Sequence, residues 1–192
     1  MILLFDMMDT VVVDPVHKEL PGFFGITTQE LFAKRDPTAW RSFEVDAISE
    51  TECLNRLFAG QGPFDHDAFR ACVRDAYRYV DGMLPLLEDL SAKKVEMHAL
   101  SNYSSWYKLV DERLNVSRFM PWTFVSFETR VRKPDAKAYT NVIDTLGGPA
   151  DRYLFIDDRE VNCQAAHAVG MHAHRFTSAA DLRRELAVLG VL

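Results

Sequence analysis

Apolar residues follow two patterns along the chain, short unbroken runs and longer stretches with helical spacing. The first unbroken run covers residues 2–5 and ends in Asp6. A run of this kind is typical of a parallel strand that is buried on both faces. We therefore expect a strand that carries the Asp6 carboxylate to its C-terminal end, the edge at which open α/β sheets bind ligands.

From residue 15 to residue 81 the pattern is helical, with no run that indicates a strand. Residues 17–24 are expected to form a loop because they contain Pro21-Gly22. Helix start signals follow at four places: Thr27 with Glu30, Asp36 with Pro37, Ser49 with Glu52, and Asp65. The first of these starts a helix that is expected to run through Lys34. Together these segments predict an all-helical insertion after the first strand.

From residue 82 onward, helical and strand-like segments alternate. Strands are expected at 95–100, 122–126, 153–156 and 172–174, and helices at 84–93, 104–114, 135–146, 160–169 and 180–189. Such alternation predicts a parallel sheet with helices on both faces. The expected fold is α/β, a Rossmann-like three-layer parallel sheet formed by residues 1–14 and 82–192, with a helical cap at 15–81.

The composition is that of an ordinary globular protein, with 48% apolar residues, 26% charged residues and a net charge of −6. This acidic balance offers no basic patch for nucleic acid, and no apolar run approaches the ~20 residues of a membrane span. The three cysteines, Cys53, Cys72 and Cys163, never form a Cys-x-x-Cys pair, which predicts reduced thiols. With no leader pattern at the N-terminus, we expect a cytoplasmic protein without nucleic-acid or membrane partners. Its oligomeric state is left open.

Two adjacent acids, Asp157 and Asp158, end the apolar run that begins at Tyr153. Side by side at the end of a buried strand they repel each other, and burial raises their pKa. A divalent cation removes both costs, and carboxylate oxygens suit Mg²⁺, which keeps several of its waters. Together with Asp6, this pair predicts a magnesium site.

The stretch Asp6-Met-Met-Asp-Thr10 resembles the first motif of the haloacid dehalogenase superfamily, which is Asp-x-Asp-x-Thr after an apolar strand. Three further motifs follow in the family's order: Ser101 at the end of a strand, Lys133 within Lys-Pro-Asp, and the pair Asp157-Asp158. The four motifs span the whole predicted sheet. The resemblance implies the superfamily's fold and its helical cap.

The resemblance also implies roles at the metal. Asp6 would be the nucleophile and a metal ligand, and Met8 would give its backbone carbonyl to Mg²⁺. Asp158 would be a direct ligand of the metal. Asp157 would not bind the metal directly but would support the residues that do.

Other matched residues would hold the phosphoryl group. The Ser101 hydroxyl and the backbone amides that follow, including that of Asn102, would bind phosphate oxygens. Lys133 would neutralise both the nucleophile and the phosphate, at a position where Pro134 is expected to occupy the first helical turn. Arg130 stands where the family usually has glycine, and it would either add a second positive charge to the site or face water.

The first motif departs from the family's pattern at one position. Met8 stands where phosphatases of the superfamily carry an Asp as general acid/base, and an additional acid, Asp9, follows it. If the chain turns helical after Asp6, Asp9 would approach the leaving group and act as a displaced acid; otherwise it would cap the turn or pair with a basic residue of the cap. Because losing a general acid costs about 10²–10⁴ in rate, a non-catalytic or weakly active phosphate binder is the main alternative to an enzyme.

Further segments are similar to the plant plastid flavin mononucleotide hydrolases, over essentially the full length and including the unusual Met8. These segments are 21–25, 79–83, 101–103, 106–107 and 122–124. The resemblance implies a Mg²⁺-dependent phosphatase that acts through an aspartyl-phosphate on a small phosphate ester, with flavin mononucleotide as a candidate. Phe23, Phe24 and Trp40 would then stack on the flavin ring or form the core of the cap.

Two other enzyme classes of the superfamily match less well. Haloacid dehalogenases lack the paired acids found here at 157 and 158. Phosphonatases lack the acid/base Asp, as this chain does, but they use a lysine from the cap. Lys18 and Lys34 are cap lysines, and neither has a sequence context that would desolvate it.

Overall fold

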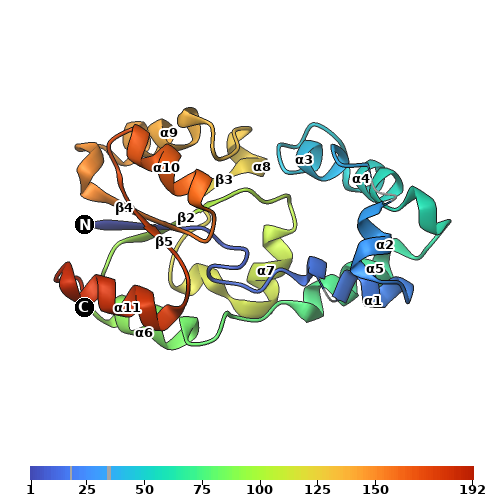
Figure 1. The fold of residues 1–192 in the computed structure, drawn as a ribbon, viewed down its shortest axis with the longest axis horizontal. Helices are drawn as coiled ribbons and strands as arrows, with labels where there is room; N and C mark the ends of the chain where they lie inside the picture. The colour runs from blue at the N-terminus through green and yellow to red at the C-terminus, as the bar shows by residue number, and fades with distance from the viewer. Residues whose placement is uncertain (18, 34–35) are drawn as a thin grey trace.

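The computed structural model describes residues 1–17, 19–33 and 36–192, and it consists of a sheet-containing core and a smaller helical part beside it (Figure 1). In the described residues the sheet has five strands: β1 (Ile2–Phe5), β2 (Met97–Ser101), β3 (Phe124–Val125), β4 (Tyr153–Asp157) and β5 (His172–Arg175). Their order is β3-β2-β1-β4-β5, and every neighbouring pair is parallel. The predicted α/β class and parallel sheet are confirmed.

The strands alternate their side chains between two apolar layers, as the period of two along a strand requires. In β1, Leu3 and Phe5 belong to one buried cluster, whereas Ile2 and Leu4 belong to the other. Helices α6 (Met83–Ala92) and α11 (Ala179–Val188) cover the first face, and α9 (Ala136–Leu146) and α10 (Glu160–Ala168) cover the second (Figure 1). The core therefore has the three layers that the pattern predicted.

The cap consists of short helices at the right of Figure 1. These are η1 (Pro15–His17), α1 (Glu19–Phe24), α2 (Thr28–Ala33), α3 (Ala39–Phe43), α4 (Glu50–Leu57), η2 (Ala59–Gln61) and α5 (His66–Ala76). The expected loop at 17–24 is wrong, because α1 buries Leu20 and Pro21 against the rest of the cap, and this packing outweighs the weak helix propensity of Pro-Gly.

Three of the four predicted helix starts in the cap are confirmed. Thr27 and Glu30 form the reciprocal capping box, and Ser49 and Asp65 accept backbone N–H bonds at the starts of α4 and α5. The fourth start is displaced: α3 begins at Ala39, because the Asp36 side chain accepts the Thr38 N–H in a turn before the helix. Residue 34, the expected end of α2, lies outside the described residues.

Several boundaries in the core also differ from expectation. β2 begins at Met97 and α7 at Tyr107, two and three residues later than predicted. The strand expected at 122–126 is confined to β3, and Ser126 opens the short helix α8 (Ser126–Thr129). Pro134 precedes α9 instead of occupying its first turn, because Asp135 is the N-cap and accepts the Lys137 N–H at 2.9 Å. The remaining core helices are α7 (Tyr107–Leu114), η3 (Val116–Arg118) and η4 (Ala150–Arg152).

The two chain segments that join core and cap run side by side. Val13 donates its N–H to Arg78 O at 2.9 Å, and Val80 donates to Val11 O at 3.0 Å. The paired residues are 11 and 13 in the first segment and 78 and 80 in the second. The expected cap boundaries, after residue 14 and before residue 82, each lie within two residues of this short antiparallel ladder. The first crossing segment therefore begins only a few residues after Asp6, which brings the cap close to the end of β1.

Two further findings concern the thiols and the helices. Cys53, Cys72 and Cys163 are free thiols. Among the described helices, none is both long enough and apolar enough to cross a membrane.

Candidate active site

The C-terminal edge of the sheet brings together polar residues that are far apart in the sequence. Asp6 follows β1 at the centre of the sheet, Ser101 ends the neighbouring β2, and Asp157 ends β4 on the other side of β1. Because the three strands are parallel, their carboxyl ends meet at the same edge. All three side chains are buried.

Lys133 links two of these acids. Its Nζ lies 2.7 Å from Asp6 Oδ1 and 2.7 Å from Asp157 Oδ2, and the side chain is fully buried. Burial favours the neutral amine, but the two carboxylates outweigh it and raise the pKa of Lys133. Burial raises the pKa of Asp6 to about 7 against the attraction of Lys133. The pair therefore consists of a stable cation and a carboxylate that is costly to keep charged.

Neighbouring amides fix the positions of this lysine and of Asp157. The Asn102 side chain donates to Lys133 O at 2.8 Å and accepts the Lys133 N–H at 2.7 Å. Asp157 Oδ1 accepts the Arg159 N–H at 2.8 Å, and the Asn162 amide donates to both Asp157 oxygens. Both Asp157 oxygens are thus engaged by protein groups, and Asn102 acts on the backbone of Lys133.

Three carboxylates at this edge fit a hard divalent cation. One oxygen from each of Asp6, Asp157 and Asp158 lies within 4.8 Å of the others. Burial and the charges of Asp157 and Asp9 raise the pKa of Asp158. Crowded carboxylates with raised pKa values are stabilised by a bound cation, and an all-oxygen donor set suits Mg²⁺. The residues present therefore fit the predicted magnesium site.

The chain after Asp6 makes one tight turn. The N–H groups of Thr10 and Val11 both point to Met7 O, at 3.4 and 2.9 Å, and Asp9 has a positive φ of 57°. This turn places Met8 and Asp9 on the pocket that Asp6 also lines. Asp9 is exposed, and its Oδ1 accepts the Asp14 N–H at 3.0 Å. Its carboxylate thus both caps the turn and borders the pocket.

The pocket above these residues has a volume of about 160 Å³. It is lined by residues of both core and cap: Asp6, Met8, Asp9, Asp14, Trp40, Glu44, Asn102, Tyr103, Arg132, Lys133, Asp158, Arg159 and Asn162. Ser101 is not among them, but its buried Oγ has no hydrogen-bond partner within the described part of the chain. This hydroxyl therefore keeps its hydrogen-bonding capacity for another group, as the predicted phosphate contact requires.

Arg130 is not part of this pocket, and the alternative in which it adds positive charge there is wrong. Its guanidinium donates to Val45 O at 3.1 Å and pairs with Asp46, so it binds the segment that follows α3. Besides Lys133, the cations Arg132 and Arg159 line the pocket. Arg132 Nε donates to Glu44 Oε2 at 2.6 Å. The positive φ of Arg130, 60°, ends α8 and turns the chain, so that residue 132 reaches the site.

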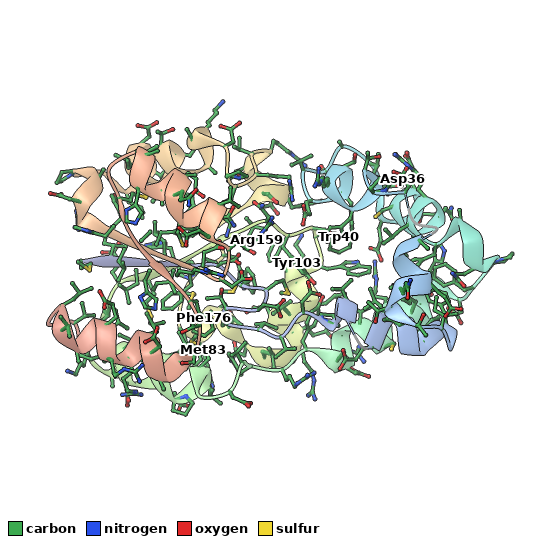
Figure 2. The ribbon with its side chains drawn as sticks, viewed as in Figure 1. Asp36, Trp40, Met83, Tyr103, Arg159 and Phe176 are labelled. Atoms are coloured by element: carbon green, nitrogen blue, oxygen red, sulfur yellow. The ribbon has the colours of Figure 1, made fainter. Side chains whose placement is uncertain are left out.

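A larger apolar cavity of about 490 Å³ adjoins the pocket. It shares Asp14, Trp40, Tyr103 and Arg159 with the pocket, and its other lining residues are Pro15, Val16, Leu20, Leu57, Val73 and Trp106. Figure 2 shows Trp40, Tyr103 and Arg159 between the core and the cap. The site thus has a polar floor in the core and an apolar chamber toward the cap.

Of the three aromatic residues singled out from the sequence, only Trp40 lines this chamber. Phe23 and Phe24 stack edge-to-face on each other and pack with Phe58, Phe64 and Phe69 inside the cap, which is the core role. Lys18 and Lys34, the cap lysines considered for a phosphonatase, lie outside the described residues.

Sequence reasoning did not identify Glu44 or Arg132 as site residues. Glu44 follows a short helix 38 residues after Asp6, and Arg132 stands next to the lysine that the motif highlights. Neither has a local motif of its own, because their proximity results from the docking of cap on core. The position of Glu44, four residues after Trp40 and directly after Phe43, was the one available signal for this residue.

Comparison with known proteins agrees with this geometry. Residues 1–170 match the family model of the haloacid dehalogenase-like hydrolases. The chain is 38% identical to the chloroplastic flavin mononucleotide hydrolase 1 of Arabidopsis thaliana over 190 residues, which cover 99% of this chain and 78% of the relative. It is 28% identical over 158 residues to the sesquiterpene phosphatase of Aspergillus oryzae, with 78% of each chain covered.

Solved structures share the fold. A magnesium complex of a HAD family enzyme from Bacteroides thetaiotaomicron superposes with a TM-score of 0.78 at 20% identity, covering 96% of this chain and 97% of that one. The same enzyme with magnesium and inorganic phosphate gives a TM-score of 0.72 at 20% identity, covering 92% and 93%. The family match over most of the chain, together with the four motifs at one sheet edge, shows that this chain is a hydrolase of the haloacid dehalogenase-like family.

Proposed function

We propose that this hydrolase is a Mg²⁺-dependent phosphatase that cleaves a small phosphate monoester through an aspartyl-phosphate on Asp6. The observation that carries the proposal is the buried Asp6–Lys133–Asp157 arrangement with 2.7 Å contacts, next to the half-buried carboxylate of Asp158. A carboxylate held by a cation at the open end of a sheet is suited to in-line attack on phosphorus.

The residues of the site have distinct roles in this reaction. Asp6 attacks phosphorus, and the leaving oxygen departs on the opposite side, toward the cap. Lys133 neutralises the attacking carboxylate and the transferred phosphoryl group, and the Ser101 hydroxyl donates to a phosphoryl oxygen. Asn102 acts by holding the Lys133 backbone; its assignment as a substrate ligand remains a prediction, as does that of Ser101. Water then attacks the aspartyl-phosphate and releases inorganic phosphate.

Asp6, Asp158 and the Met8 carbonyl would hold the metal, and when bound Mg²⁺ would neutralise charge on the phosphoryl oxygens. Asp157 is suited to the supporting role, because its oxygens already accept bonds from Lys133, Asn162 and the Arg159 amide. Such outer-shell acids orient the ligand residues and the lysine.

Flavin mononucleotide is the proposed substrate. The relative that carries this activity in its name is 38% identical over nearly the whole chain. The apolar cavity of about 490 Å³ beside the pocket offers Trp40, Tyr103 and Trp106 to an aromatic leaving group. We also propose that the protein is located in the cytoplasm, and this proposal rests on its composition.

A second candidate function is phosphate-ligand binding without turnover, and Met8 is the observation that favours it. The two family rivals have less support. The cluster of Asp6, Asp157 and Asp158 favours a metal-dependent phosphatase over a dehalogenase. The phosphonatase alternative rests on lysines that the structure does not describe.

The test is turnover of a panel of phosphate monoesters, including flavin mononucleotide, sugar phosphates and 4-nitrophenyl phosphate, with Mg²⁺ and with a chelator. We expect Mg²⁺-dependent release of phosphate by the wild type and none by Asp6→Asn. Binding of phosphate esters without turnover of any of them would favour the binder. Turnover by folded Asp6→Asn within tenfold of the wild type would contradict the nucleophile assignment.

A further inference from the structure

The pocket lacks the usual acid/base because Met8 occupies its position, yet it contains another carboxylic acid that the family motifs do not specify. Glu44 follows α3 in the cap and lines the same pocket as Asp6, Met8 and Lys133. It is only 5% exposed, which is unusual for a glutamate. A buried acid at a catalytic pocket is a candidate for proton transfer.

The position of Glu44 is fixed from three sides. Arg132 Nε donates to Glu44 Oε2 at 2.6 Å, and the Trp40 side chain interacts with the Glu44 carboxyl group. The Ser126 hydroxyl donates to Glu44 O at 2.7 Å, which ties the cap backbone to the start of α8. The carboxyl group is thus held toward the pocket by both core and cap.

The direction of attack sends the leaving group toward the cap, which contributes Glu44 to the pocket lining. Asp6 attacks from the floor of the pocket, and in an in-line displacement the leaving oxygen departs on the far side of phosphorus. Glu44 is the buried acid that the cap contributes to the pocket lining in the described residues. We propose that Glu44 replaces the missing acid/base at position 8, an assignment that rests on the proposed phosphatase function.

The proton balance is complete with Glu44 alone. As Asp6 bonds to phosphorus, the bond to the leaving oxygen breaks, and that oxygen takes the proton of Glu44 to leave as an alcohol. The Glu44 carboxylate then takes a proton from the water that attacks the aspartyl-phosphate. The bond between Asp6 and phosphorus breaks, inorganic phosphate leaves, and both acids return to their starting states.

The surroundings of Glu44 give it a suitable protonation state. Burial raises its pKa to about 7, although Arg132, Trp40 and Arg41 lower it. Tyr103 and the thiol of Cys53 also lie within electrostatic reach of this carboxyl group. A pKa near the working pH is what an acid that alternates between donor and acceptor needs.

Asp9 and Asp14 are the rival acids on the pocket. Asp9 is exposed and accepts the Asp14 N–H, and Asp14 Oδ1 accepts the Val16 N–H at 2.9 Å. These bonds give both residues a place in the turn that leads into the cap.

The experiment compares Glu44→Gln with Asp9→Asn and Asp46→Asn on two substrates at saturating Mg²⁺. Hexyl phosphate needs protonation of its leaving group, whereas 4-nitrophenyl phosphate does not. Asp46→Asn is the matched control, because it makes the same change in the same segment and weakens only the contact with Arg130. Thermal unfolding shows whether each variant is folded.

We expect Glu44→Gln to lower kcat/KM, which covers the steps through departure of the leaving group, by about 100-fold or more for hexyl phosphate and by less than about tenfold for 4-nitrophenyl phosphate. Asp46→Asn should change neither by more than about twofold. In the wild type, kcat/KM for hexyl phosphate relative to that for 4-nitrophenyl phosphate should fall as the pH rises through about 7. This wild-type profile tests the proposal even if Glu44→Gln fails to fold.

An equal loss of kcat/KM for both substrates in Glu44→Gln would overturn the proposal and leave Glu44 a contact between cap and core. Substrate-selective slowing by Asp9→Asn and not by Glu44→Gln would assign the acid to Asp9. A wild type that hydrolyses neither substrate, nor any other phosphate ester, would overturn the phosphatase function itself. That result can be told apart from failure of the Glu44 assignment, because it is obtained with the wild type alone.

Discussion

Asp6→Asn should make the metal-free protein more stable while it removes the nucleophile. The Asp6 side chain is buried beneath the pocket, and burial raises its pKa from 3.8 to about 7 despite the contact with Lys133. An acid whose pKa is higher in the folded than in the unfolded state holds its proton more tightly when the protein is folded. Its contribution to the free energy of unfolding is therefore fully present below the unfolded-state pKa and is lost as the pH rises to the folded-state pKa. Stability of the chelated wild type should therefore fall between about pH 4 and pH 7.

The size of the effect follows from the shift. The difference of about 3 units corresponds to about 4 kcal/mol at 1.36 kcal/mol per unit. Asparagine does not titrate, so it avoids this cost, but its contact with the Lys133 ammonium is weaker than that of a carboxylate. We expect Asp6→Asn to raise the free energy of unfolding by about 2–4 kcal/mol at pH 8 in chelator, and by less at pH 5.

Urea unfolding of both proteins in chelator at pH 5 and pH 8 measures this difference. Added Mg²⁺ should stabilise the wild type more than the variant, since a ligand that binds only the folded state contributes about 2.7 kcal/mol at 100 times its Kd. The difference in the free energy of unfolding between Asp6→Asn and the wild type should therefore narrow or reverse in Mg²⁺. An Asp6→Asn protein that is no more stable than the wild type at pH 8 in chelator would refute the reasoning.

Three further predictions concern other parts of the site. Asp158→Ala should weaken Mg²⁺ binding more than Asp157→Ala, whose loss as a supporting group should cost about 10–100-fold; calorimetric titration of both variants gives the ranking. Trp40→Leu should raise KM for flavin mononucleotide about tenfold, the equivalent of 1.4 kcal/mol, and leave inhibition by inorganic phosphate within about twofold. Asn102→Ala removes two hydrogen bonds to Lys133, so it should lower the free energy of unfolding by about 1–3 kcal/mol in a urea titration and reduce kcat.

The residues at strand ends could be predicted because their chemistry is local. Asp6, Ser101 and Asp157 each end an apolar run, and parallel pairing brings such ends to one edge without any knowledge of the loops. The capping box of Thr27 and Glu30 was equally readable, because both hydrogen bonds lie within four residues.

The remaining features depend on contacts between distant segments. α1 forms over Pro21-Gly22 because the cap buries Leu20, and no local pattern contains that information. Arg130 and Arg132 look alike in the sequence, and the left-handed conformation of Arg130 decides which one reaches the pocket. Glu44 joins the site only because the cap docks against α8.

The most direct test of the central claim is to identify the phosphorylated residue during turnover. Wild-type protein mixed with flavin mononucleotide and Mg²⁺, quenched in acid and digested, would be analysed by peptide mass spectrometry. The mechanism predicts one additional phosphoryl group on the N-terminal peptide, located at Asp6 and absent from Asp6→Asn. Phosphate release without any phosphorylated Asp6, or with the phosphoryl group on another residue, would contradict it.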